Sequence, residues 1–155
     1  MEDLSSIVED QQAEVRLENP LTGAPMGMWF TFAGPEHPIR KDRSLARQRK
    51  MRKQFEKTQA IELGDPEDDL EKELNDMVAA TLGWRCQDDQ SDEGGPYIVF
   101  GGEKIPFSAE AVRRLYADPK RAWLRRWARG KMNDINVFTK ACSTPSAATP
   151  AGTSI

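Results

Sequence analysis

The chain has 155 residues, of which 38% are hydrophobic and 30% charged, and its formal net charge is −3. This length and composition fit one small domain with a modest core. No apolar run approaches the roughly 18 residues that a transmembrane helix requires, and the N-terminus is acidic where a signal peptide would be basic, so we expect a soluble intracellular protein. The only two cysteines, Cys86 and Cys142, lie outside any metal-binding spacing and support no disulfide framework.

The N-terminal third predicts an arm followed by strands. Residues 1–13 are polar and acidic, which is typical of a flexible arm. A single α+β domain is expected over residues 14–138, starting with two short strands at 15–18 and 28–33. In the second strand, Phe30 and Phe32 recur with period two and form an apolar face that predicts core positions.

Residues 38–57 predict a long helix with two different sides. Leu45, Met51 and Phe55 form a thin apolar stripe on a helical wheel. Because this stripe is thin, we expect the helix to lie at the edge of the domain and to offer its basic side to a partner. The candidate partner-binding residues on that side are Arg40, Arg43, Arg47, Lys50 and Lys53.

The next segment reverses the charge and predicts a second helix. Asp65 is the expected N-cap, Pro66 the first helical residue and Gly83 the stop, with Trp84 behind it as a core anchor. Acidic residues dominate positions 62–76. We therefore expect an antiparallel pair in which the basic and acidic helices face each other.

The C-terminal half predicts a loop after Trp84, a hairpin and two helices. Residues 97–100 are expected to pair with 104–107, or alternatively with the stretch just after Trp84. Ser108 would cap a helix at 109–117, and Asp118 with Pro119 would start the next one. The fold class is thus α+β, mainly helical with about four helices, one or two short hairpins, disordered termini and a low-complexity tail at 139–155.

The aromatic and basic residues of these helices have two expected roles. The remaining core candidates, beside Phe30, Phe32 and Trp84, are Phe107, Leu115, Tyr116 and Trp123. Arg125, Trp127 and Arg129 form a second candidate partner-binding surface, since Trp and Arg are enriched at interfaces.

Catalytic and metal-binding patterns are absent from the sequence. His37 is the single histidine and has no evident partner for general base catalysis. The acidic segment lacks the spacing of a calcium loop, and the glycine pairs at 94–95 and 101–102 lack the remaining residues of a phosphate-binding loop. We expect no enzyme, no metal and no cofactor.

Three stretches carry a resemblance to a known family. They are "ENPLTGAPMGMWFTFAGPEHP" before the basic helix, "AATLGW", and "IPFSAEAVRRLYADPKRAWLRRW". Their order resembles the tail assembly chaperones of long-tailed bacteriophages and their prophage-encoded relatives. Ala111 departs from the family pattern, which has Asn there, so a cap or contact made by that amide is missing. The matching positions are Phe107, Ser108, Glu110, Leu115, Tyr116 and Trp123.

The resemblance implies a non-enzymatic assembly factor in the host bacterial cytoplasm. Such proteins bind the tape-measure protein and help recruit tail tube subunits, and many also occur as a longer frameshifted product. Two alternatives remain: a nucleic-acid-binding regulator that uses the basic helix 38–57, and a structural minor tail or head-tail connector component. The acidic net charge and the lack of interleaved aromatics argue against nucleic acid, no membrane partner is expected, and homo-oligomerisation stays open.

Overall fold

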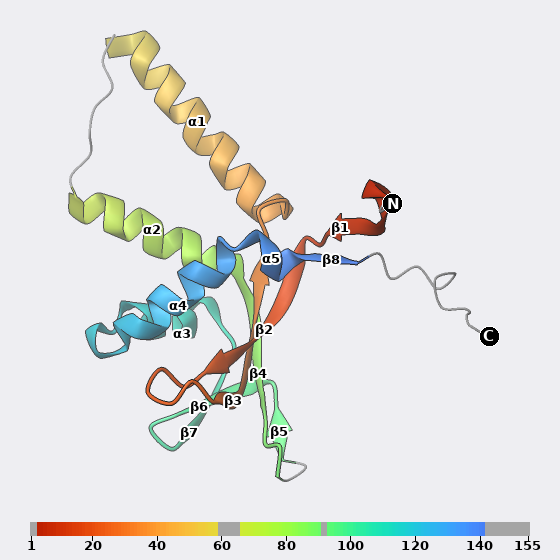
Figure 1. The fold of residues 1–155 in the computed structure, drawn as a ribbon. Helices are drawn as coiled ribbons and strands as arrows, with labels where there is room; N and C mark the ends of the chain where they lie inside the picture. Colours follow the sequence, from red (N-terminus) through yellow and green to blue (C-terminus); the bar gives the residue numbers. More distant parts are fainter. Residues whose placement is uncertain (1–2, 59–65, 91–92, 142–155) are drawn as a thin grey trace.

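The structure is a computed structural model that describes residues 3–58, 66–90 and 93–141. It confirms the expected α+β class (Figure 1). The proposed Asp65 cap and the tail beyond residue 141 lie outside the described residues. The strands are β1 (Ile7–Glu9), β2 (Gln12–Glu18), β3 (Pro25–Ala33), β4 (Thr81–Gln87), β5 (Gly94–Gly95), β6 (Tyr97–Phe100), β7 (Glu103–Pro106) and β8 (Thr139–Ala141). The α-helices are α1 (Pro38–Thr58), α2 (Pro66–Ala80), α3 (Ala109–Ala117), α4 (Ala122–Met132) and α5 (Ile135–Phe138), and two 3₁₀ turns are η1 (Leu4–Ser6) and η2 (Pro119–Arg121).

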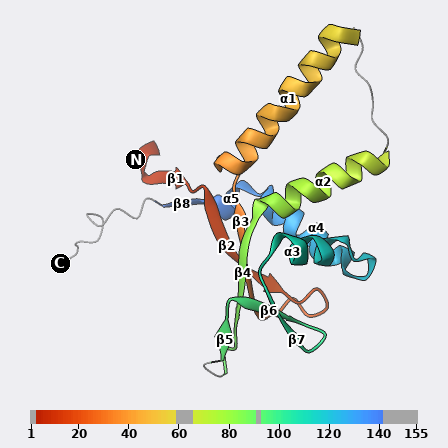
Figure 2. The same cartoon turned by 180° about the vertical axis from the view of Figure 1, so that it is seen from behind.

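A four-stranded antiparallel sheet with the order β2-β3-β4-β5 forms the framework. The alternation predicted for residues 28–33 holds, because Phe30 and Phe32 are buried on one face of β3. Helices α2, α3 and α4 lie on the same side of the sheet in both views (Figures 1 and 2). The fold therefore has two layers, with helices over one face of the sheet.

The prediction for residues 81–87 was wrong. Helix α2 ends at Ala80 rather than at Gly83, and the expected loop after Trp84 is the second half of strand β4. The physical reason is the aromatic core: pairing with β3 places Trp84 opposite Phe30, with the ring centroids 5.8 Å apart. The indole Nε1 of Trp84 also donates to the carbonyl oxygen of Ile105 at 3.0 Å, which links the sheet to β7.

Most of the predicted core residues are buried. Phe30, Phe32, Trp84, Leu115 and Tyr116 all belong to the core, and Trp123 packs against it with part of its surface exposed.

One core prediction was wrong. The side chain of Phe107 is 37% exposed, and its ring makes an edge-to-face contact with Trp84 at 5.4 Å between centroids. Residue 107 follows the last residue of β7, so its side chain lies at the margin of the aromatic cluster rather than inside it.

The hairpin and the helix cap predicted for the C-terminal half are present, whereas the helix after Asp118 starts later than predicted. The hairpin of β6 and β7 pairs Ile98 with Ile105 as expected, and the Ser108 hydroxyl caps α3 by accepting from the Ala111 amide at 3.0 Å. Asp118 caps the 3₁₀ turn η2 through the Lys120 amide, so α4 starts only at Ala122.

The expected N-terminal arm and C-terminal tail differ from the structure where they are described. Strand β1 pairs antiparallel with β8, so residues 7–9 lie beside 139–141. An ion pair of 2.8 Å between Lys140 and Asp10 joins the same two segments. The sheet itself already begins at Gln12, and the ordered domain therefore extends beyond the predicted limits of 14 and 138.

Candidate partner-binding surface

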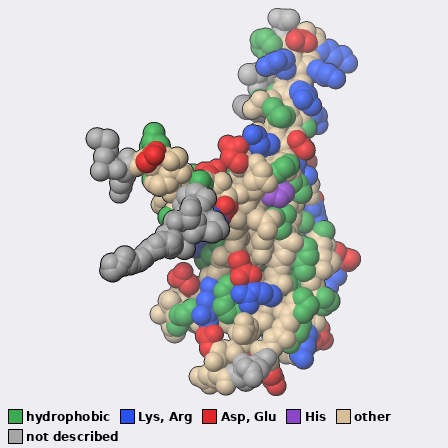
Figure 3. Space-filling model, turned by 90° about the vertical axis from the view of Figure 1, so that its right-hand side faces the viewer, with side chains coloured by type: hydrophobic (Ala, Val, Ile, Leu, Met, Phe, Trp, Pro, Cys, Tyr) green, Lys and Arg blue, Asp and Glu red, His purple; other side chains and the backbone are tan. Residues whose placement is uncertain are grey.

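Helix α1 projects from the body of the protein, and among the described residues only its first turn contacts the core. Ile39 packs against the core cluster, and the side chains from Lys41 through Lys53 are all exposed. In the space-filling view the projecting helix carries most of the visible Lys and Arg side chains (Figure 3). The expectation of a basic helix at the edge of the domain agrees with this arrangement.

Arg40 fastens the base of α1 to the body. Its Nη1 donates to the carbonyl oxygens of Ala33 (3.1 Å) and Met132 (2.7 Å), and its Nη2 donates to Oδ1 of Asn133 (3.0 Å). Burial of the guanidinium lowers the pKa of Arg40 from its usual value. Arg40 was predicted to meet a partner, whereas these contacts give it a structural role.

The first turn of α1 has a further polar contact at His37. The Nδ1 atom of this histidine accepts from the Ile39 amide at 3.1 Å, which satisfies one of the donors at the start of the helix. The single histidine thus has a local structural role in the turn between β3 and α1.

Asp76 of α2 binds two arginines of α1. Its Oδ1 accepts from Arg43 at 2.9 Å and its Oδ2 from Arg47 at 2.5 Å. The predicted contact between the basic and acidic helices is confirmed here, at the base of the pair. Beyond this point the two helices diverge in both ribbon views (Figures 1 and 2). Arg43 and Arg47 are therefore paired within the chain, and two of the five residues of the predicted basic face are partly neutralised.

The outer half of α1 retains exposed cations that have no ion pair within the described residues. Lys50, Lys53 and Lys57 are spaced i, i+3, i+7 and share one side of the helix, which we call the lysine face. Lys50 and Lys53 were predicted as partner-binding residues, and they remain accessible in the structure.

A second exposed side of α1, which we call the outer face, mixes cations with large apolar groups. Leu45, Met51 and Phe55 are 45%, 53% and 47% exposed. Arg49 and Arg52 follow Leu45 at i+4 and i+7 and lie on the same side. Sequence reasoning noted the apolar stripe but passed over these two arginines, although the helical wheel places them beside it.

The second predicted surface on α4 does not form. Trp127 packs against the rings of Phe30 and Phe32, each with a centroid distance of 5.7 Å, so it is a core residue rather than an interface residue. Arg129 forms an ion pair of 2.6 Å with Glu73 and ties α4 to α2, while Arg125 is half-buried. The three residues therefore do not meet as one accessible patch.

Sequence reasoning missed a paired network on the sheet face opposite the helices. Trp29 on β3 lies between the guanidinium groups of Arg16 on β2 and Arg85 on β4, at 4.7 and 4.2 Å from the ring centroid. Arg85 donates to both carboxylate oxygens of Glu14 at 2.7 Å, and this contact lowers the pKa of Glu14. Arg16, Trp29 and Arg85 lie at paired positions on three neighbouring strands. The network could therefore be predicted only if residues 81–87 were recognised as a strand.

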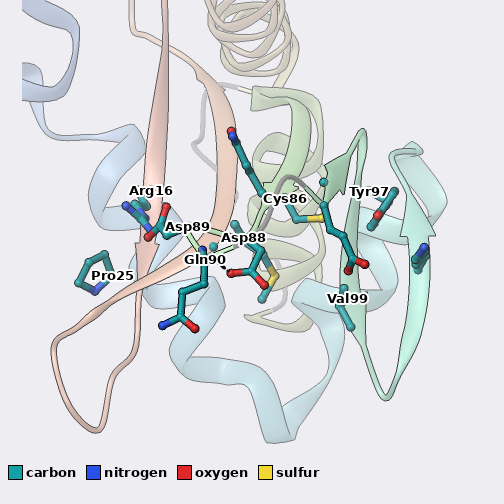
Figure 4. Close-up of a pocket in the computed structure, with 14 residues that line it drawn as sticks. Arg16, Pro25, Cys86, Asp88, Asp89, Gln90, Tyr97 and Val99 are labelled. Carbon is teal, nitrogen blue, oxygen red and sulfur yellow. Dashed lines mark hydrogen bonds and ion pairs between the residues drawn. The ribbon is translucent and has the colours of Figure 1, made fainter.

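Two of the cavities border the hairpin of β6 and β7. The first, of about 450 Å³, lies beside the β4–β5 turn; in its close-up Arg16 and Asp89 point toward each other, and they form an ion pair (Figure 4). The second, of about 410 Å³, has an apolar lining that includes Trp84, Ile98 and Leu115.

Neither a metal-binding cluster nor a membrane-spanning helix is found in the described part of the chain. Within residues 3–58, 66–90 and 93–141, no group of three His, Cys, Asp or Glu side chains could hold a metal ion. None of the helices in these ranges has both the length and the apolar character needed to cross a bilayer.

Comparison with protein-family models, with curated proteins and with solved structures finds no match to this chain.

Proposed function

We propose that this protein is a tail assembly chaperone of a long-tailed bacteriophage or prophage, which binds the tape-measure protein in the host bacterial cytoplasm and helps to recruit tail tube subunits. The observation that carries the proposal is the lysine face of α1, an exposed cationic surface on a helix that is fixed to the body at its base. The protein works by binding and performs no covalent chemistry.

The chemistry of the lysine face suits a long helical client with acidic residues. Cations on flexible stems form distributed contacts without a fixed geometry, and such contacts favour fast association and ready release. The position of the face on a projecting helix lets a client lie along it without displacing the core. A client that must later leave for the growing tail needs this kind of reversible binding.

A pull-down of co-expressed tape-measure protein tests the proposal. The variant Lys50→Glu with Lys53→Glu should lose the client, and wild-type binding should weaken as the salt concentration rises. The matched control is Lys120→Glu with Arg126→Glu, which reverses the same number of exposed cations away from α1 and should retain the client. Equal recovery of the client by both variants would refute the lysine face as its binding surface.

The same exposed cations favour nucleic acid as the second candidate partner. A gel shift at physiological salt, with and without competitor DNA, separates the two functions, because the chaperone should leave the probe unshifted. A role as a minor tail or connector component would place the protein in finished particles. Mass spectrometry of purified virions should not detect a chaperone.

A further inference from the structure

The apolar cavity of about 410 Å³ lies between the hairpin of β6 and β7 and helix α3, and we call it the hairpin cleft. In both ribbon views the hairpin lies below α3 (Figures 1 and 2). Clefts of this size with hydrophobic and aromatic walls are typical sites of small ligands. The interior of the hairpin cleft is lined by Trp84, Ile98, Phe100, Ile105, Ala111 and Leu115.

A small side chain on α3 leaves the cleft open. Ala111, Leu115 and Asp118 are spaced i, i+4 and i+7, so they lie on one side of the helix, and all three line the cleft. Leu115 is largely buried, whereas the side chain of Ala111 ends at its Cβ atom. On the hairpin, Ile98 is paired directly with Ile105, so both side chains lie on the same face. Helix and hairpin therefore present apolar groups to the cleft without filling it.

The interior of the hairpin cleft has little to offer a polar ligand. The indole Nε1 of Trp84 is the one polar side-chain atom among the six interior residues, and it already donates to the carbonyl oxygen of Ile105 at 3.0 Å. The rings of Trp84 and Phe100 can make edge contacts with a further ring, which are more favourable than contacts with an aliphatic group. The interior therefore suits an apolar aromatic group.

The charges at the mouth of the cleft are balanced within the chain. Arg114, which lines the mouth, forms an ion pair of 3.1 Å with Glu110. The carboxylate of Asp118 accepts from the Lys120 amide at 3.0 Å and lies 3.7 Å from Nη1 of Arg121. An ionic ligand would have to displace one of these contacts, so the mouth favours a ligand without net charge.

We propose that the hairpin cleft binds a small uncharged aromatic molecule. The ring system lies between α3 and the hairpin in contact with Trp84 and Phe100, and a polar substituent points out through the mouth to solvent. The cleft shares no residue with the lysine face of α1. This second site is therefore independent of the proposed client binding.

A titration of isotope-labelled protein with naphthol, followed by amide NMR spectra, tests the proposal. The shifts should saturate and should be largest for the residues that line the hairpin cleft. The anionic analogue naphthoate and the cationic analogue naphthylmethylammonium should both bind more weakly than the neutral compound, because a charge at the cleft finds no free partner among the lining residues.

Three alanines of α3 provide matched variants. Ala111 and Ala117 line the hairpin cleft, whereas Ala109 is exposed and does not line it. Ala111→Leu and Ala117→Leu fill the cleft and should each weaken naphthol binding at least about tenfold. Ala109→Leu adds the same side chain to the same helix and should leave binding unchanged. Because Ala117 is exposed, its replacement tests the cleft without disturbing the core.

Three results would each overturn the proposal. The first is the absence of saturable naphthol binding to the wild type. The second is undiminished binding by either cleft variant, or an equal loss in Ala109→Leu, with native helix content confirmed by far-UV circular dichroism. The third is tighter binding of either ion than of naphthol, since that would show an unbalanced charge at the mouth.

Discussion

At the scale of single residues, the hydrogen bond between Tyr116 and Thr81 is the most deeply buried polar contact described. The two hydroxyl oxygens are 2.8 Å apart, and the Thr81 hydroxyl donates to the carbonyl oxygen of Met77 at 2.9 Å. The Tyr116 hydroxyl must therefore donate to Thr81. Thr81→Val should cost about 1–3 kcal/mol because it leaves this donor unpaired, and Tyr116→Phe only about 1 kcal/mol, as chemical denaturation would measure.

The same burial predicts how stability depends on pH. Burial raises the pKa of Tyr116 above its usual value, so the folded state retains the proton that the unfolded state loses at about pH 10. This contribution to stability is complete below that pH and falls as the pH rises further. The unfolding free energy of Tyr116→Phe should decline less than that of wild type between about pH 9 and pH 11. Parallel declines would contradict a buried, protonated Tyr116.

Arg40 and Lys41 are neighbours in the sequence, but Arg40 is hydrogen-bonded to the body of the protein and Lys41 is exposed. A pair of substitutions can show this difference. Arg40→Gln removes a charged group from three oxygen acceptors and should lower the unfolding free energy by about 2 kcal/mol. Lys41→Gln removes an exposed ion pair with Glu36 and should leave the unfolding free energy nearly unchanged. Similar values for both variants in denaturant titrations would exclude the anchoring role of Arg40.

At the scale of elements, Asp76 controls how closely α1 is held to α2. Asp76→Asn should weaken the contacts to Arg43 and Arg47 while the core stays intact, because the ion pairs are partly exposed and contribute little to global stability. Hydrogen–deuterium exchange should therefore become faster in α1, with a nearly unchanged melting temperature. Glu110→Gln, which breaks the exposed pair with Arg114, is the control and should leave exchange in α1 unchanged.

Elements with a strong local signal were predictable from the sequence. The alternation around Phe30 and Phe32, the Ser108 cap and the turn at Gly101 and Gly102 are each specified within a few residues, and the structure has all three. Strand β4 was missed because its main partner, β3, is distant in sequence. Nothing near Gly83 shows that β3 lies alongside, and a glycine before a polar stretch is also the usual end of a helix.

The candidate site shows the same limit. The accessible Lys50 and Lys53 followed from helix periodicity alone, whereas the pairing of Arg43 and Arg47 depends on where α2 lies in space. Trp127 has the composition of an interface residue, and only its contact with two rings of β3 places it in the core. The spacing of residues along one helix therefore predicted which side chains share a face. It did not predict which of them contact a residue of another element.

At the scale of the whole molecule, the protein divides into an aromatic core and a projecting helix that contributes little to it. Replacing Leu45, Met51 and Phe55 by Gln should change the unfolding free energy by no more than about 0.5 kcal/mol per site, because these side chains are exposed. Phe32→Ala, within the core, should cost about 3–5 kcal/mol. Denaturant titrations of the purified variants measure both. A triple variant as unstable as Phe32→Ala would show that α1 packs against the body in solution, and the lysine and outer faces would then not be open to partners.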